Sequence, residues 1–267
     1  GAPRQTLRLM GEANQPRAVG NRDGADYSAD LSAYGRQSAA QLLAGPERIC
    51  GFVVKKDSPS CGMQRVRVYG DNGIPSRAGV GLFTHELLLA HPWLPAEEEG
   101  RLQDPRLREN FIERVYVCQR WWQLCDAGLT AARLVEFHTT HKYMLMARGV
   151  EPYRRLGRVV AAAGSGDLEP LAQRYFLALM AALQQVASCG NHTNVLMHLM
   201  GYLKRQIVAR EKQELLGLID AYRLGELPLV VPVTMLKHHL GRHPQHYLQR
   251  QHYFAPYPEG LGLRNGI

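Results

Sequence analysis

Hydrophobic and polar residues follow a short, changing pattern over the first hundred residues. Residues 49–54 form a brief apolar run that ends at Lys55 and Lys56, and residues 66–69 alternate between apolar and polar. Runs of this length between turns rich in Gly, Pro and Asp predict β-strands. A helix is predicted over residues 84–90, with Thr84 as its N-cap. This mixture predicts an α/β fold with a short, mainly parallel sheet and helices.

From about residue 104 onward, apolar residues recur at helical spacing. Leu107, Phe111, Val115 and Cys118 are 4, 4 and 3 residues apart, which predicts an amphipathic helix over residues 105–127 that ends at Gly128. Further helices are predicted over residues 130–148, 167–187, 192–210, 211–224 and 234–239, the last capped by Thr234. Pro228 and Pro232 predict an extended connector, because a proline disfavours helix at the residue before it.

A Pro-rich and acidic stretch, residues 91–100, separates the two patterns and is typical of a linker. The chain is therefore expected to contain an α/β domain, residues 1–103, and an all-α helical domain, residues 104–267. Because the chain opens at Gly1 inside what reads as the middle of a segment, the first domain is expected to lack its N-terminal part.

Composition excludes several classes of protein. Of the 267 residues, 45% are hydrophobic and 21% are charged, which is typical of a globular protein and not of a disordered one. Apolar runs stay short of the roughly 18 residues that a membrane span needs, so no membrane association is predicted. The 5 cysteines are odd in number and lack the spacing of a disulfide framework, which favours a reducing cytoplasm.

Positive charge is concentrated in the second part of the chain. Residues 104–267 contain 20 Lys and Arg against 13 Asp and Glu, a net charge of +7, whereas residues 1–103 have a net charge of +1. This balance favours an acidic partner such as nucleic acid. A soluble surface rich in arginine explains the charge equally well.

Residues 58–62 have the clearest chemical content, because they place a thiol and two hydroxyls in a turn directly after a predicted strand. The thiol of Cys61 can bind a metal ion or cluster, and Ser58 can donate a hydrogen bond to a substrate or accept one. Lys55 and Lys56 would favour the thiolate of Cys61. The alternative is an inert cysteine in a polar turn.

Other residues that could bind a metal or a ligand are interpreted as structural. Two imidazoles three or four residues apart can bind zinc, but packing is favoured for each His pair. Residues 191–194 are interpreted as a capped helix start, residues 79–81 as a tight strand-to-helix turn, and Cys50, Cys118 and Cys125 as core residues. The His pairs are His138 with His141, His239 with His243, and His243 with His246.

Several separate segments resemble known families. Residues 3–9, 51–63 and 79–81 resemble the 2-thiouracil desulfurase (TudS-like) family. Residues 104–267 resemble the C-terminal domain of YbgA-like bacterial proteins, notably in residues 191–198, 228–232 and 256–259. The first resemblance implies a [4Fe-4S] cluster held by three cysteines, with one iron free to bind the sulfur of a thiocarbonyl base.

On this resemblance, Cys61 matches the third cluster ligand. Ser58 matches a serine beside the substrate pocket, as a proton donor or an orienting group. The first two ligands of the family precede the Pro3-Arg4 motif, and Cys50 matches neither of them. The chain as given is therefore expected not to hold the cluster.

Two functions from different classes follow. In the first, the complete protein is an enzyme that removes sulfur from a thiolated nucleobase or related thiocarbonyl compound, and the helical domain aids substrate or partner binding. In the alternative, the protein is a non-catalytic module whose basic helical domain engages nucleic acid or a protein partner.

Overall fold

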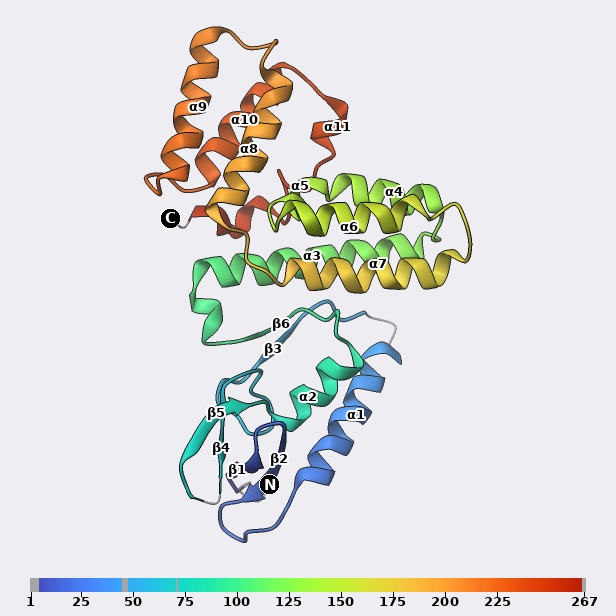
Figure 1. Cartoon of the computed structure of the whole chain (residues 1–267), viewed down its shortest axis with the longest axis vertical. Helices are drawn as coiled ribbons and strands as arrows, with labels where there is room; N and C mark the ends of the chain where they lie inside the picture. The colour runs from blue at the N-terminus through green and yellow to red at the C-terminus, as the bar shows by residue number, and fades with distance from the viewer. Residues whose placement is uncertain (1–4, 45–47, 71, 266–267) are drawn as a thin grey trace. The chain divides into compact units, whose positions relative to one another are not determined.

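The computed structural model describes residues 5–44, 48–70 and 72–265, so Pro3 and Arg4 lie outside the described residues. The chain divides into two compact units, Gly1–Asp104 (unit 1) and Pro105–Ile267 (unit 2). Strands and helices together build unit 1, whereas unit 2 is built from helices (Figure 1). The predicted fold class, α/β followed by all-α, is confirmed.

Unit 1 contains two small sheets. The first has the order β2-β1-β4-β5, with β1 parallel to β4 and the two outer pairs antiparallel. The second pairs β3 with β6 in parallel. The first sheet is therefore mixed and the second parallel. The strands are β1 (Leu7–Glu12), β2 (Gln15–Gly20), β3 (Phe52–Val54), β4 (Val66–Tyr69), β5 (Pro75–Gly79) and β6 (Ala96–Glu98).

Two helices, α1 (Ser28–Ala44) and α2 (Leu82–Ala90), pack against each other in unit 1 (Figure 1). A Cβ on Gly35 would come within 3.0 Å of the Glu86 side chain, so the helices approach closely there. Leu82 at the start of α2 joins a core with Leu9, Val66 and Val68 from the mixed sheet. This core fixes the first turn of α2 against the strands.

Unit 2 is helical, as the apolar spacing predicted, but the helix predicted over residues 130–148 is divided into two at His141, and the helix predicted over residues 192–210 ends at Leu203. The predicted helix over residues 105–127 is observed as α3, and Gly128 follows it with a φ of +93°, a conformation that favours glycine. The helices are α3 (Pro105–Asp126), α4 (Ala131–Thr140), α5 (Lys142–Met146), α6 (Val150–Ala161), α7 (Leu168–Leu183), α8 (Cys189–Leu203), α9 (Ala209–Arg223), α10 (Val230–Arg242) and α11 (His246–Gln249).

Three further local predictions were wrong. Residues 227–232 do not form an extended connector, because α10 begins at Val230 and contains Pro232. Proline is tolerated in a first turn, where its missing N–H would have no partner in the helix. Thr234 therefore lies inside α10 and does not cap it, and Thr84 is likewise inside α2, which begins at Leu82 after Gly81.

Aromatic side chains fill the core between α3 and α7. Trp121 stacks on Phe176 with ring centroids 4.7 Å apart, and Tyr175 lies 5.9 Å from the same indole. His138 and His141, considered above for zinc, are buried beside this core, where the His138 imidazole contacts the hydroxyl of Tyr175 at 3.2 Å. Within the described ranges, no helix has the length and apolar character needed to cross a membrane.

Candidate functional site

The 58–62 loop leaves β3 and folds its polar side chains onto one another. The Oγ of Ser58 accepts a hydrogen bond from the backbone N–H of Cys61 at 3.1 Å, which closes the turn. The Oγ atoms of Ser58 and Ser60 are 3.1 Å apart, and the Ser60 Oγ lies 3.3 Å from the Cys61 Sγ. The two hydroxyls and the thiol thus form a continuous chain of hydrogen bonds, and all three side chains are half-buried.

The first turn of α2 holds this loop through its backbone. The N–H of Leu82 donates to the carbonyl of Pro59 at 3.1 Å, and the N–H of Phe83 donates to the carbonyl of Ser60 at 2.9 Å. The Thr84 hydroxyl donates to the carbonyl of Cys61 at 2.7 Å. Donors at this helix N-terminus are therefore used to fix the loop.

Gly81 allows the loop and the helix to approach this closely. A Cβ at this position would lie 2.4 Å from the carbonyl carbon of Ser60 and 2.6 Å from the backbone N of Cys61. Real side chains do not tolerate such contacts with backbone atoms. The residues 79–81, interpreted from sequence as a tight strand-to-helix turn, do connect β5 to α2, and Gly81 in addition contacts the loop that contains Cys61.

Two glutamates at the end of β6 organise the chain on either side of the loop. Glu98 accepts hydrogen bonds from the N–H groups of Met63 and Gln64 at 3.1 and 3.4 Å. Glu99 binds the Lys55 Nζ at 2.9 Å and accepts from the Lys56 N–H at 2.7 Å. The hydrogen bond from Lys55, with that from the Lys56 N–H, lowers the pKa of the half-buried Glu99. Lys55 thus pairs with a carboxylate.

The cysteines differ in their surroundings. Cys118 is fully buried, as predicted for a core residue. Cys50 and Cys125, also predicted as core residues, are only half-buried, and so are Cys61 and Cys189. The part of the chain that the structure describes contains no group of three His, Cys, Asp or Glu side chains that could hold a metal ion. The predicted ligand Cys61 is therefore a single thiol among hydroxyls here.

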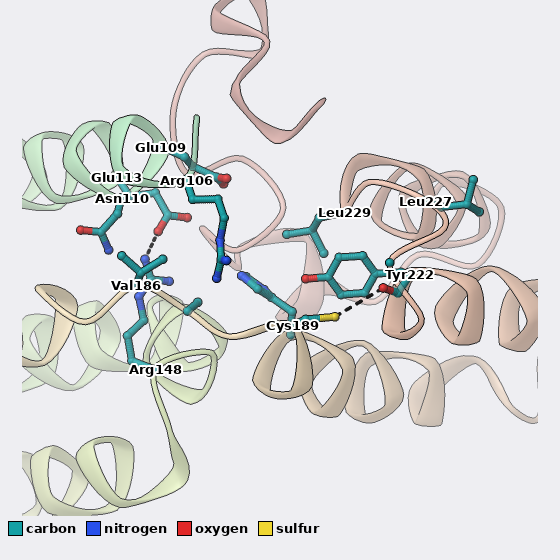
Figure 2. A pocket seen from close by; sticks show the side chains of 13 residues that line it. Arg106, Glu109, Asn110, Glu113, Arg148, Val186, Cys189, Tyr222, Leu227 and Leu229 are labelled. Atoms are coloured by element: carbon teal, nitrogen blue, oxygen red, sulfur yellow. Dashed lines mark hydrogen bonds and ion pairs between the residues drawn. The ribbon is translucent and has the colours of Figure 1, made fainter. Parts of the chain in front are cut away.

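Unit 2 contains a second polar site that the sequence did not suggest. A cavity of about 160 Å³ lies where α3, the end of α5 and the first turn of α8 meet, and we call it the α3–α8 cavity. Arg106, Glu109 and Glu113 of α3 line it together with Arg148, Cys189 and His192. Figure 2 shows Arg106 extending into the space between the Glu113–Arg148 pair and the pair of Cys189 and Tyr222.

A buried network of charges forms one wall of the cavity. Glu113 accepts from Arg148 at one carboxylate oxygen and from the Nη2 of Arg264 at the other, the second at 3.1 Å. Glu109 accepts from the Arg264 Nε at 2.9 Å and from the Tyr257 hydroxyl at 3.0 Å. Burial raises the pKa of Glu109, and the charge of Glu113 acts in the same direction.

His192 lies at the cavity in an uncharged form. Its Nδ1 is 2.9 Å from the hydroxyl of Tyr253. Burial, followed by the positive charges of Arg264 and Arg148, lowers the pKa of His192 to about 3. Residues 191–194 were interpreted from sequence as a capped helix start, but α8 begins earlier, at Cys189. Its cap is Ser188, whose Oγ accepts from the Asn191 N–H at 3.2 Å.

Comparisons with known proteins match two separate parts of the chain. The family model described as 2-thiouracil desulfurase matches residues 1–99, and that described as a protein of unknown function, DUF1722, matches residues 142–258. No solved structure shows significant similarity to the chain. The uncharacterised protein YbgA of Escherichia coli (strain K12) is 33% identical over 161 residues, which are 60% of this chain and 95% of that protein. Because the similarity extends over nearly all of that protein, the chain belongs to the YbgA family.

Proposed function

We propose that the protein removes sulfur from a thiolated nucleobase or a related thiocarbonyl compound, and that the 58–62 loop is the site of this reaction. The match of residues 1–99 to the 2-thiouracil desulfurase family is the observation that carries the proposal. In the overall reaction, water replaces the sulfur, so that C=S becomes C=O and hydrogen sulfide leaves. The proposed substrate is accordingly a small molecule, and unit 2 would aid its binding.

Cys61 and Ser58 have distinct proposed roles in the loop. Cys61 provides a thiol, the soft donor type that suits iron and sulfur. Ser58 holds the backbone of Cys61 through its Oγ and can pass a hydrogen bond to Ser60, which in turn can donate to the Cys61 Sγ. Ser58 would thus orient the thiol and the substrate, or donate a proton to the leaving sulfur.

The resemblance to desulfurases implies a [4Fe-4S] cluster, whose usual ligands are cysteine thiolates. Among residues 5–44, 48–70 and 72–265, no three candidate ligands come together, and the Cys61 thiol is hydrogen-bonded to the Ser60 hydroxyl. These residues do not fit the cluster by themselves. A cluster at Cys61 would require further thiolates, so the roles above are confined to the hydroxyls and the thiol of the loop.

The test compares variants of the natural protein after anaerobic incubation with iron and sulfide. Iron content and the hydrogen sulfide released from 2-thiouracil are both measured. We expect Cys61→Ala to lose both, and Ser58→Ala to lose sulfide release. Cys50→Ala serves as the matched control, since Cys50 is also half-buried in unit 1, and it should retain both properties. Undiminished sulfide release by Cys61→Ala would reject the assignment.

A second candidate function is binding of nucleic acid or another acidic partner by unit 2, with unit 1 as a non-catalytic support. The net charge of +7 over residues 104–267 favours it. Binding that neutralises several phosphates weakens steeply as salt increases. The affinity for an oligonucleotide is therefore measured at low and high salt, and a flat dependence would exclude nucleic acid as the partner.

A further inference from the structure

Glu98 is a buried carboxylate without a cationic partner, at the end of β6. Its side chain is 2% exposed, and no Lys, Arg or His in the described part of the chain lies within ion-pair distance of it. The glutamates on either side do have such partners, since Glu97 binds Arg101 at 2.7 Å and Glu99 binds Lys55 at 2.9 Å. A charge is costly to bury unless hydrogen bonds replace those of water. The hydrogen bonds that Glu98 accepts are therefore essential to its burial.

The backbone directly after the 58–62 loop supplies these hydrogen bonds. One carboxylate oxygen of Glu98, Oε1, accepts from the N–H of Met63 at 3.1 Å and from the N–H of Gln64 at 3.4 Å. Among the residues that the structure describes, no other group donates to this carboxylate, and neither N–H has another acceptor. The carboxylate and these two N–H groups depend on one another, because their separation would leave a buried anion without donors.

This attachment lies close to the candidate thiol along the chain. β3 and β6 are parallel neighbours, so the strand from which the 58–62 loop leaves and the strand that carries Glu98 end at the same edge (Figure 1). Met63 is two residues after Cys61, whose own carbonyl accepts from the Thr84 hydroxyl of α2. The segment that follows the thiol is therefore held from β6, and the thiol's own residue from α2.

We propose that Glu98 is a positioning residue of the candidate site, which fixes the Cys61 thiol by holding the N–H groups of Met63 and Gln64. The role belongs to the hydrogen bonds of the carboxylate. Its consequence for catalysis rests on the function proposed above, whereas the attachment itself is tested without substrate. Displacement of a reacting group by about 1 Å can lower a rate roughly a hundredfold, so this attachment would matter for turnover.

Amide hydrogen exchange and alkylation of Cys61 by iodoacetamide test the attachment in the full chain. We expect Glu98→Ala to speed exchange at Met63 and Gln64 at least about tenfold, because a hydrogen bond to a charged group is lost, and to speed alkylation of Cys61. Glu98→Gln retains an acceptor oxygen and should restore both rates. Glu99→Ala is the matched control, since it removes a hydrogen bond on the other side of the loop and should leave exchange at Met63 and Gln64 unchanged.

Turnover separates positioning from a purely structural role. Sulfide release from 2-thiouracil is measured with the natural protein after anaerobic incubation with iron and sulfide. We expect Glu98→Ala to lower kcat at least about tenfold with KM unchanged, and Glu98→Gln to retain kcat. A wild-type protein that releases no sulfide would reject the proposed function, and exchange and alkylation would then decide the role of Glu98.

Three results would overturn this role. The first is a folded Glu98→Ala variant with unchanged exchange and alkylation, and the second is a Glu98→Gln variant that behaves like Glu98→Ala. Should Glu98→Ala fail to fold, exchange in the wild-type protein decides. We expect slow exchange at Met63 and Gln64, and exchange as fast as in an unstructured peptide is the third contradicting result.

Discussion

The hydroxyl of Thr84 donates a 2.7 Å hydrogen bond to the backbone carbonyl of Cys61 across 23 residues of sequence. Thr84 is fully buried, so this bond is shielded from water. It links the third residue of α2 to the residue whose thiol faces Ser60. The position of the candidate ligand therefore depends on a helix whose start the sequence placed two residues too late.

Replacing Thr84 with Val should loosen the 58–62 loop. The substitution keeps the shape of the side chain but leaves the Cys61 carbonyl without its donor, which costs about 1 to 3 kcal/mol. We expect a lower midpoint in urea unfolding of unit 1 and faster alkylation of Cys61. Thr84→Ser keeps the hydroxyl and should preserve the alkylation rate, so equal rates in Thr84→Val and Thr84→Ser would contradict the role of this bond.

Replacing Gly81 with Ala should displace the same loop by a steric route. The new Cβ would meet the carbonyl carbon of Ser60 at 2.4 Å, and overpacking of this kind costs about 1 to 3 kcal/mol. Gly100→Ala is the control, because the nearest atom to its Cβ is 3.5 Å away in the flexible side chain of Lys56. Denaturant unfolding should separate the two variants, and similar stabilities would show that the contact with Ser60 is relieved at little cost.

Replacing Glu113 with Gln should destabilise unit 2 strongly. The change removes the carboxylate shared by buried Arg148 and Arg264, so that Arg148 loses its counter-charge and Arg264 keeps only Glu109. Removal of one partner from a buried ion pair costs about 3 to 5 kcal/mol. Glu151→Gln, in an exposed pair with Arg158, should change the free energy of unfolding by less than about 1 kcal/mol. Equal effects in urea titrations would argue against the network as a structural element.

The stability of unit 2 should fall as the pH decreases from about 6.5 toward 4. Burial lowers the pKa of His138 and His252 to about 4, and that of His192 to about 3. As the pH decreases, these imidazoles are therefore protonated at a higher pH in the unfolded chain than in the folded one. In this window each imidazole lowers the free energy of unfolding by up to about 1.4 kcal/mol for each unit that the pH decreases. Its stabilising contribution is complete at a pH above the pKa of the unfolded chain. The raised pKa of Glu109 acts in the opposite direction.

Urea unfolding at several pH values measures this slope. We expect His138→Gln to reduce the slope of the unfolding free energy against pH by up to about 1.4 kcal/mol per pH unit, the contribution of one proton. A free energy of unfolding that stays constant between pH 6.5 and 4.5 would show that these imidazoles are not kept neutral by the fold.

Much of the helical part of the fold could be predicted from residue spacing. The apolar positions 107, 111, 115 and 118 predicted α3 to within one residue at its C-terminus, because helix periodicity is a local property. Prolines were interpreted less well, since Pro232 was assigned to an extended segment whereas a first helical turn accommodates it. The hairpin of β1 and β2 and helix α1 were not predicted at all.

The candidate functional residues likewise divide into those that the sequence could identify and those that only the fold brings together. Ser58 and Cys61 are near neighbours in sequence, so their turn, and the family resemblance it carries, could be recognised without a structure. Arg106, Arg148 and His192 are 42 and 44 residues apart, and each alone is an ordinary residue of a helical region. The packing of α3, α5 and α8 makes them neighbours, because side chains from separate helices share an environment once the apolar faces between them are buried. Charge balance and cavity volume are properties of that shared environment, and local periodicity contains no information about them.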